Sequence, residues 1–228
     1  MRLSRLGWAS PAIVAVLAAT ACGGAARGGA ETPGAPSPAA TDFESLFYAR
    51  QDSARMRYTE ADVRFMTGMI AHHAQALVMA GLVPTRSTNP AIRTLAARII
   101  NAQKDEIATM QRWLRDRGQP VPEVHADGTR PMAHGAAHAM HMPGMLTPEQ
   151  LDALERARGA EFDRLFLTYM IQHHRGAVVM VHDLFATDGA GQDEIAFRLA
   201  SDVQVDQLTE IARMERMLSS LGGAGSAP

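Results

Sequence analysis

The feature that most constrains this sequence is an internal repeat centred on two adjacent histidines. Residues 69–79 read Met-Ile-Ala-His-His-Ala-Gln-Ala-Leu-Val-Met, and residues 170–180 read Met-Ile-Gln-His-His-Arg-Gly-Ala-Val-Val-Met, an offset of 101 positions. A second pair of similar segments follows at residues 95–118 and 199–222, at an offset of 104. A repeated pair of segments is typical of a fold built from two copies of one structural unit.

The repeated unit has the pattern of a helical hairpin. Apolar residues recur every three or four positions, and the composition favours helix formers, with only 5% aromatic residues. One hairpin buries little apolar surface, whereas two stacked hairpins close a core. We therefore expect an all-α fold: a four-helix bundle over residues 41–222, made of duplicated hairpins at about 59–118 and 147–222 and related by a pseudo-twofold axis.

Local signals predict where the helices begin and end. Thr59, Asn89 and Thr147 each stand where a helix N-cap is expected. A short additional helix is expected from residue 41 onwards, and Gly159 marks a possible break in the third long helix. Residues 84–88 are expected to form a loop.

The N-terminus has the pattern of an export signal. Two arginines precede an apolar run at 11–19, which is too short to span a bilayer permanently. The run leads to Cys22 in a context similar to a bacterial lipobox, so residues 1–22 are interpreted as a signal peptide and Cys22 as a lipidation site. Residues 23–40 are rich in Gly, Ala and Pro and are expected to be a disordered tether. The predicted product is exported and membrane-anchored, facing the periplasm or cell exterior, or else secreted.

The helical period places the histidines inside the predicted bundle. At about 100° per residue, both members of each pair can face inward, together with neighbouring methionines. The candidate metal ligands from the repeats are His72, His73, Met69, Met79, His173, His174, Met170 and Met180. Four residues of the partner helices could support the imidazoles from behind, namely Gln103, Glu106, Gln207 and Glu210.

The segment between the repeats, about 123–146, has an unusual composition. Residues 132–145 hold four methionines and three histidines, interrupted by glycine and proline. Such a segment is not a core helix, and large apolar methionines are not expected in a solvated linker, so it is interpreted as a flexible tract for soft metals. Its candidate ligands are His134, His138, Met140, His141, Met142 and Met145.

The ligand types favour copper or silver. Thioethers suit Cu(I) and Ag(I), and imidazole also suits Cu(II). Cysteine is not reliably reduced outside the cytoplasm, so methionine with histidine is the durable combination there. If histidines ligate, Cu(II) uptake is expected to weaken as pH falls through about 6.5, the ordinary pKa of imidazole.

Other functions are less well supported by the sequence. The net charge of −2 and the absence of basic clusters exclude nucleic acid as an expected partner. No catalytic role is expected, because a paired-carboxylate arrangement and the Glu-x-x-His ligands of di-iron bundles are missing. Two alternatives stay open: a metal-dependent oxidoreductase, and a metal-free module in which the histidines form a buried polar network and the surface binds an unknown protein partner.

The full motif resembles a known bacterial family. Asp-x-x-Phe-x-x-x-Met-Ile-x-His-His-x-x-Ala followed by Gln-x-x-Glu-Ile-x-x-Met resembles domain-of-unknown-function family 305, in tandem copies at residues 59–118 and 160–222. The resemblance implies a ferritin-like four-helix bundle. Some members are periplasmic copper-binding proteins, which implies as motif residues His72, His73, His173, His174, Met69 and Met170.

Overall fold

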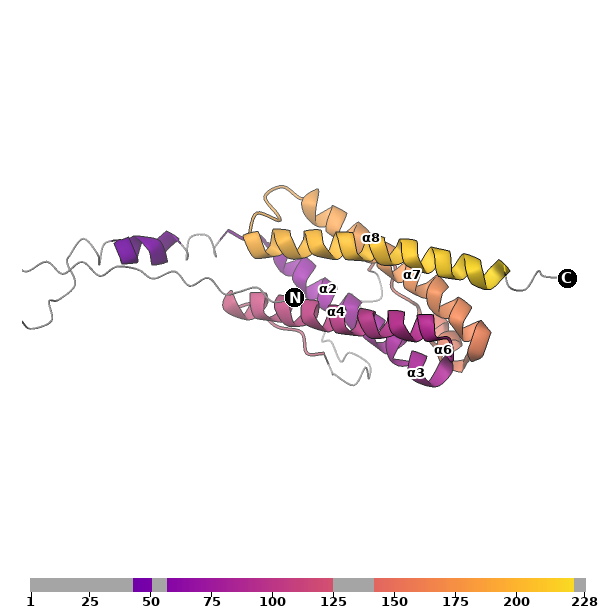
Figure 1. The fold of residues 1–228 in the computed structure, drawn as a ribbon. Helices are drawn as coiled ribbons and strands as arrows, with labels where there is room; N and C mark the ends of the chain where they lie inside the picture. The colour runs from indigo at the N-terminus through magenta and orange to yellow at the C-terminus, as the bar shows by residue number, and fades with distance from the viewer. Residues whose placement is uncertain (1–42, 51–56, 125–141, 224–228) are drawn as a thin grey trace, which may run out of the picture. The chain divides into compact units, whose positions relative to one another are not determined.

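The computed structural model describes residues 43–50, 57–124 and 142–223 (Figure 1). Its helices, in chain order, are α2 (Glu60–Gly81), α3 (Val83–Arg86), α4 (Pro90–Asp116), α6 (Pro148–Arg156), α7 (Gly159–Phe185) and α8 (Glu194–Gly223). Residues 43–50 are also helical, in agreement with the expected leading helix. The predicted signal peptide, its Cys22 and the tether at 23–40 lie outside the described residues.

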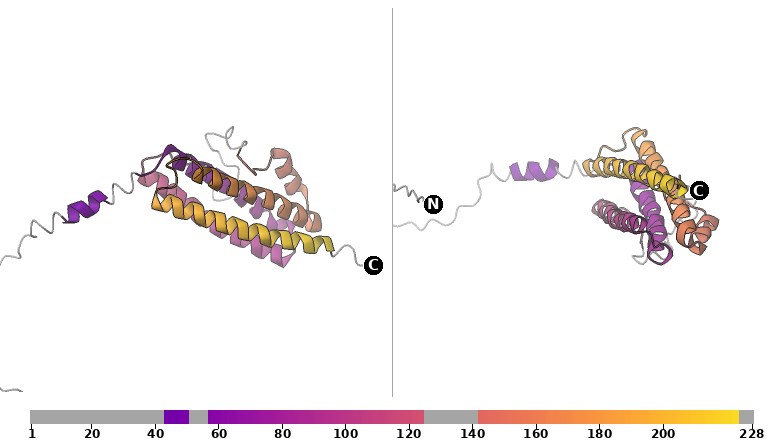
Figure 2. Two further views of the ribbon diagram at one scale, coloured as in Figure 1. Left: turned by 90° about the horizontal axis from the view of Figure 1, so that it is seen from above. Right: turned by 45° about the vertical axis from the view of Figure 1, so that its right-hand side comes forward.

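The four long helices form two hairpins that pack together. Helix α2 packs against α4, and α7 packs against α8. The hairpins meet through α2 and α7, which lie side by side in the views of Figures 1 and 2. The predicted all-α four-helix bundle is confirmed, and the described residues contain helices but no strand.

The helix starts follow the predicted capping residues. Thr59 forms a capping box with Asp62 at the start of α2, and Thr147 forms one with Gln150 at the start of α6. The Asn89 side chain accepts the Ala91 N–H at 3.0 Å. These side chains satisfy backbone N–H groups that have no partner within their own helix.

Two connections differ from a simple hairpin. The segment expected as a loop at 84–88 contains most of α3, because proline is tolerated in the first turn of a helix and Pro84 stands there. The possible break near Gly159 is a real one. Helix α6 ends at Arg156 and α7 begins at Gly159, which has a φ of +56°. The left-handed region is readily accessible to glycine, which lets the chain turn there.

The apolar core is divided into two clusters. One is centred on Phe162 and Phe166, the other on Phe65 and Trp113. Full burial of each such side chain stabilises the fold by about 1.5–3 kcal/mol. The stretch 60–86 is long and apolar enough to cross a membrane, but 67% of its apolar 18-residue window is buried inside the bundle. Its apolarity therefore fits the central helix of the core.

Candidate metal centre

The two histidine pairs form a polar layer in the middle of the bundle. Along α2, Met66 and Met69 precede the pair and belong to one apolar cluster, whereas Ala76 and Met79 follow it and belong to the other. Along α7 the two apolar clusters follow each other in the reverse order, as expected because α2 and α7 are antiparallel. The predicted inward orientation is confirmed, because the side chains are 0% exposed for His72, His73, His173 and His174.

Each histidine is oriented by a hydrogen bond from its Nε2 atom. His73 pairs with Glu106 Oε2 at 2.6 Å, and His174 pairs with Glu210 Oε2 at 2.7 Å, so the two hairpins repeat this contact. The other two imidazoles use backbone carbonyls. These are His72 with the oxygen of Pro143 at 3.1 Å, and His173 with the oxygen of His72 at 3.0 Å.

The second ring nitrogen of each of these four histidines has no hydrogen-bond partner among the described residues. The Nδ1 atoms of all four are buried and make no hydrogen bond within the described part of the chain. Because a carbonyl oxygen only accepts, the proton of a neutral His72 or His173 lies on Nε2 and leaves a lone pair on Nδ1. Metal-binding histidines usually show this arrangement, with one nitrogen held by an oxygen and the other free to ligate.

Burial keeps the imidazoles of His72 and His173 neutral. The pKa of His72 is lowered from 6.5 to about 3, first by burial and then by the nearby His73, and the Pro143 carbonyl opposes the shift. Burial, followed by His72, also lowers the pKa of His173 well below its ordinary value. Both side chains therefore present an uncharged nitrogen at physiological pH.

The methionines of the repeats lie at different depths. Met69, Met170 and Met79 are fully buried, and Met79 belongs to the cluster around Phe162 and Phe166. Met180 is half-buried. Met69 and Met170 stand three positions before His72 and His173, so each lies one turn from its histidine on the same helix face.

The end of the inter-repeat segment docks onto the histidine layer. Pro143 contacts His72, and Gln75 makes two hydrogen bonds with the backbone of Leu146, at 3.1 and 2.8 Å. On the other side, a Cβ added to Gly176 would lie only 1.9 Å from the Pro143 oxygen. The contact therefore requires glycine at position 176.

Sequence analysis missed this docking, although a signal was present. Gln75 and Gly176 occupy equivalent positions of the two repeats. A long amide in one copy and a glycine in the other indicate that something packs asymmetrically there.

The segment Met142–Met145 itself forms a turn closed by the Met145 N–H and the Met142 oxygen at 3.3 Å. Proline in second place and Gly144 at φ +76° in third place are typical of a type II turn.

The predicted residues are only partly brought together. Glu106 and Glu210 contact the histidines as expected, but both side-chain polar atoms of Gln103, and Gln207 Oε1, have no hydrogen-bond partner among the described residues. Met142 and Met145 are half-buried. Within the described ranges, no three His, Cys, Asp or Glu side chains form a ready metal site. Four candidate ligands lie outside those ranges, namely His134, His138, Met140 and His141.

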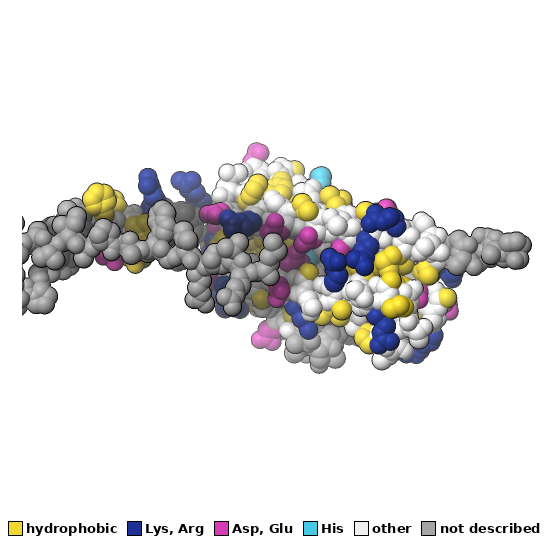
Figure 3. Space-filling model, in the orientation of Figure 1, with side chains coloured by type: hydrophobic (Ala, Val, Ile, Leu, Met, Phe, Trp, Pro, Cys, Tyr) yellow, Lys and Arg dark blue, Asp and Glu magenta, His cyan; other side chains and the backbone are white. Residues whose placement is uncertain are grey.

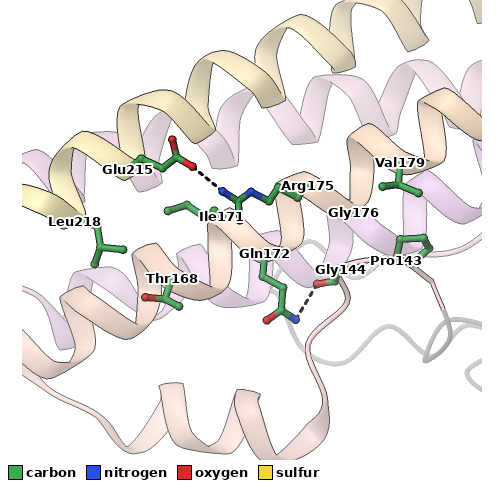
Figure 4. A pocket seen from close by; sticks show the side chains of 10 residues that line it. All are labelled: Pro143, Gly144, Thr168, Ile171, Gln172, Arg175, Gly176, Val179, Glu215 and Leu218. Carbon is green, nitrogen blue, oxygen red and sulfur yellow. Dashed lines mark hydrogen bonds and ion pairs between the residues drawn. The ribbon is translucent and has the colours of Figure 1, made fainter.

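A surface groove of about 710 Å³ lies beside the docked turn (Figure 4). Pro143 and Gly144 line it together with residues of α7 and α8, and Arg175 pairs with Glu215 at 2.7 Å. Figure 4 shows Gln172 close to Gly144, whose carbonyl it contacts at 3.4 Å. The lining contains neither histidine nor methionine, so this groove is not the candidate centre.

Acidic side chains gather where α4 and α8 face the viewer in Figure 3. The pKa of Asp206 on α8 is raised, first by burial and then by the nearby Glu106, Glu210 and Asp202, with Arg98 opposing the shift. Two of these neighbours are the carboxylates that hold His73 and His174. The negative charge therefore lies on the outer side of the two histidine–glutamate pairs.

The fold and the site define a four-helix bundle with a buried layer of four histidines. The chain belongs to the DUF305 family: the family model described as "Domain of unknown function (DUF305)" matches residues 62–218. This match covers both hairpins at once, so the expectation of two tandem family copies is not confirmed. A single hairpin does not close a core, which explains why the family unit contains all four long helices.

Solved structures of the family are similar along most of their length. A DUF305 fragment from Deinococcus radiodurans is 31% identical, with a TM-score of 0.59, over 72% of this chain and 98% of that chain. A Streptomyces coelicolor DUF305 protein, provisionally described as secreted, is 30% identical, with a TM-score of 0.58, over 71% of this chain and 92% of that chain.

A third relative has been solved with metals. CopM in the Cu(II)-bound form is 30% identical, with a TM-score of 0.54, over 70% of this chain and 96% of that chain, and Cu(I)-bound and Ag-bound forms are similar as well. Among curated sequences, an uncharacterized protein of Acanthamoeba polyphaga mimivirus is 38% identical over 56 residues, which are 25% of this chain. The chain matches 37% of the length of that curated relative.

Proposed function

We propose that this protein binds copper or silver outside the cytoplasm and sequesters the metal or hands it on, without catalysis. The observation that carries the proposal is the set of four buried histidines, each with Nε2 held by an oxygen and with an Nδ1 that no described residue contacts by a hydrogen bond. The similarity to CopM, solved with Cu(I), Cu(II) and Ag, supports the choice of metal.

The donor atoms fit this cargo chemically. Neutral imidazole nitrogens suit both copper oxidation states, and the buried thioethers of Met69 and Met170 suit Cu(I) and Ag(I). The ligand set would comprise the Nδ1 atoms of His72 and His173 together with these two sulfurs. His73 and His174 would contribute their own Nδ1 atoms, with Glu106 and Glu210 fixing the rings from behind.

A histidine double variant tests this assignment. The background is a full chain in which the Met and His residues of 132–141 are replaced by serine, so that metal bound by that segment does not contribute. In this background, His72→Gln with His173→Gln is expected to lose the Cu(I) or Ag(I) ion bound by the histidine layer, which competition titrations measure as a loss of bound metal. The matched control is His182→Gln, which changes an exposed histidine of α7 and should leave affinity unchanged.

The same variants separate the metal site from a metal-free polar network. A ligand role predicts loss of metal with the helical circular dichroism retained. If the parent chain bound neither Cu(I) nor Ag(I), or if the double variant kept full affinity, the proposal would be wrong. Loss of stability without any effect on metal would instead support the alternative of a buried hydrogen-bond network.

We also propose that the chain is exported and anchored through a lipid on Cys22. The arginines, apolar run and lipobox-like sequence before Cys22 support this proposal. Metabolic labelling with a radioactive fatty acid should mark the wild-type chain but not Cys22→Ser. Labelling of neither chain, with the protein released in soluble form, would favour simple secretion.

A further inference from the structure

Two methionine side chains from distant parts of the chain meet at one point on α2. A Cβ built on Gly68 would lie 3.3 Å from Met142 Sδ and also 3.3 Å from Met180 Cε. Met142 begins the docked turn, and Met180 lies on α7. The side chains of both are half-buried, so their ends meet where the bundle borders solvent.

The presence of glycine at position 68 is explained only by the space that its missing side chain leaves. It stands in the interior of α2, where glycine is less favourable than alanine by about 1 kcal/mol. Its φ is not among the positive values that would require glycine. The equivalent position of the second repeat is Tyr169, so the repeat itself does not call for a small residue. The glycine gives room to two methionine ends.

Met142 is held in place by the turn that follows it. The type II turn fixes its backbone, and Pro143 is bound to His72 and packed against Gly176. Met180 lines a shallow hollow of about 190 Å³ between α2 and α7, which also includes Asp183. The half-buried Met180 side chain therefore borders this hollow, beside the opposite charges of Arg64 and Asp183.

We propose that Met142 and Met180 form a two-thioether site for Cu(I) or Ag(I) above Gly68. Soft monovalent ions accept thioether sulfur, whereas divalent hard ions do not prefer it. The site lies one helical turn from His72, which occupies position i+4 on the same face of α2. It receives the ion at the surface before the ion reaches the histidine layer, and it thus rests on the proposed function in copper or silver handling.

The test observes the methionine methyl groups directly. The full chain is labelled with ¹³C at the methionine methyls and titrated with Ag(I), which is diamagnetic. The signals of Met142 and Met180, assigned from Met142→Leu and Met180→Leu, should shift within the first equivalents of silver. The control signal is that of Met217, a half-buried methionine of α8 that packs in the apolar cluster around Phe162.

The double variant Met142→Leu with Met180→Leu keeps apolar volume but removes both sulfurs. It is expected to lose one equivalent of bound Ag(I), or to bind it at least about tenfold more weakly, at an unchanged melting temperature. Met217→Leu should bind as the wild type does. Unshifted Met142 and Met180 signals, or undiminished binding by the double variant, would overturn the two-thioether site.

The outcomes also distinguish this site from the proposed function. In a sample that is also labelled at the histidine rings, if silver shifts the ring signals of His72 and His173 but leaves the Met142 and Met180 signals unchanged, only the two-thioether site is wrong. If no histidine or methionine signal responds in the wild-type chain, the proposed function fails together with it. In the His72→Gln, His173→Gln variant, the Met142 and Met180 shifts should persist.

Discussion

The imidazoles of His72 and His173 lie against each other where α2 meets α7, with ring centroids 3.8 Å apart and a tilt of 40° between their planes. They occupy equivalent positions of the two repeats, yet their hydrogen bonds differ. His173 is bound to the carbonyl of His72, and His72 is bound to the carbonyl of Pro143. A chain of contacts therefore runs from the docked turn through α2 to α7.

The neutral histidine layer should make the metal-free protein sensitive to acid. Between pH 6.5 and about 3, the unfolded chain protonates its histidines while His72 stays neutral in the folded state. The unfolded state then binds more protons, so stability falls as pH decreases below 6.5. The expected slope approaches about 1.4 kcal/mol per pH unit for each such histidine.

Urea unfolding at pH 7.5, 6.5 and 5.5, after metal removal by a chelator, measures this slope. His72→Gln should reduce it by roughly the contribution of one histidine. His182→Gln changes an exposed histidine and serves as the control, with a slope close to that of the wild type. Equal stability at pH 7.5 and 5.5 would contradict the buried neutral state.

Glu106 is expected to act on metal through His73. Glu106→Gln keeps an oxygen that can accept the imidazole N–H, but it removes the negative charge that holds the ring. Loss of such a supporting carboxylate typically lowers metal affinity about 10–100-fold. Competition titration with Cu(I) should show this decrease for Glu106→Gln and also for Glu210→Gln. Glu155→Gln, exposed on α6, is the control, and unchanged affinity in both test variants would limit the carboxylates to a structural role.

Gly176→Ala should loosen the docked turn. Its Cβ would meet the Pro143 oxygen at 1.9 Å, so the backbone must shift. We expect a destabilisation of about 1–3 kcal/mol, the usual range for overpacking, and faster hydrogen exchange of the Leu146 amide, which is bound to Gln75. Gly81→Ala is the control, because nothing lies within 4 Å of the added Cβ. A melting temperature for Gly176→Ala equal to that of the control would refute the close contact.

Asp206→Asn should stabilise the metal-free fold slightly at neutral pH. The raised pKa of Asp206 means that its charged form is disfavoured in the folded state, so this residue destabilises the fold as pH rises above its ordinary pKa of 3.8. Because the side chain is largely exposed, the gain is expected to be only a few tenths of a kcal/mol. Urea unfolding at pH 7 compares Asp206→Asn with the control Asp152→Asn on α6. A loss of stability in Asp206→Asn would show that the negative charge of Asp206 stabilises the fold and would contradict this prediction.

Local and periodic signals in the sequence predicted most of the fold. Thr59, Asn89 and Thr147 cap helices because their side-chain oxygens act on the nearest backbone N–H groups, which is a local effect. The histidines face inward because the apolar residues around them follow one helical period. The leading helix and the break at Gly159 were found from the same kinds of signal.

The details of the site depend on contacts that periodicity does not encode. The partner of His72 is a backbone carbonyl 71 positions away, and such an oxygen has no signature in the sequence. The pairing of Met142 with Met180 depends on the space at Gly68, which is visible only once the turn is docked. The expected pH dependence of Cu(II) uptake also assumed an ordinary imidazole pKa, and burial removes that basis for His72 and His173.

The docked turn makes different demands on the two halves of the bundle. It belongs to the second half by connectivity but is bound by Gln75 of the first half, and it fits only against the glycine of the second. Two copies of the first half would place a glutamine where the turn needs glycine, and two copies of the second half would lack the glutamine that binds Leu146. Each half therefore supplies one feature that the turn requires and that the other half does not have.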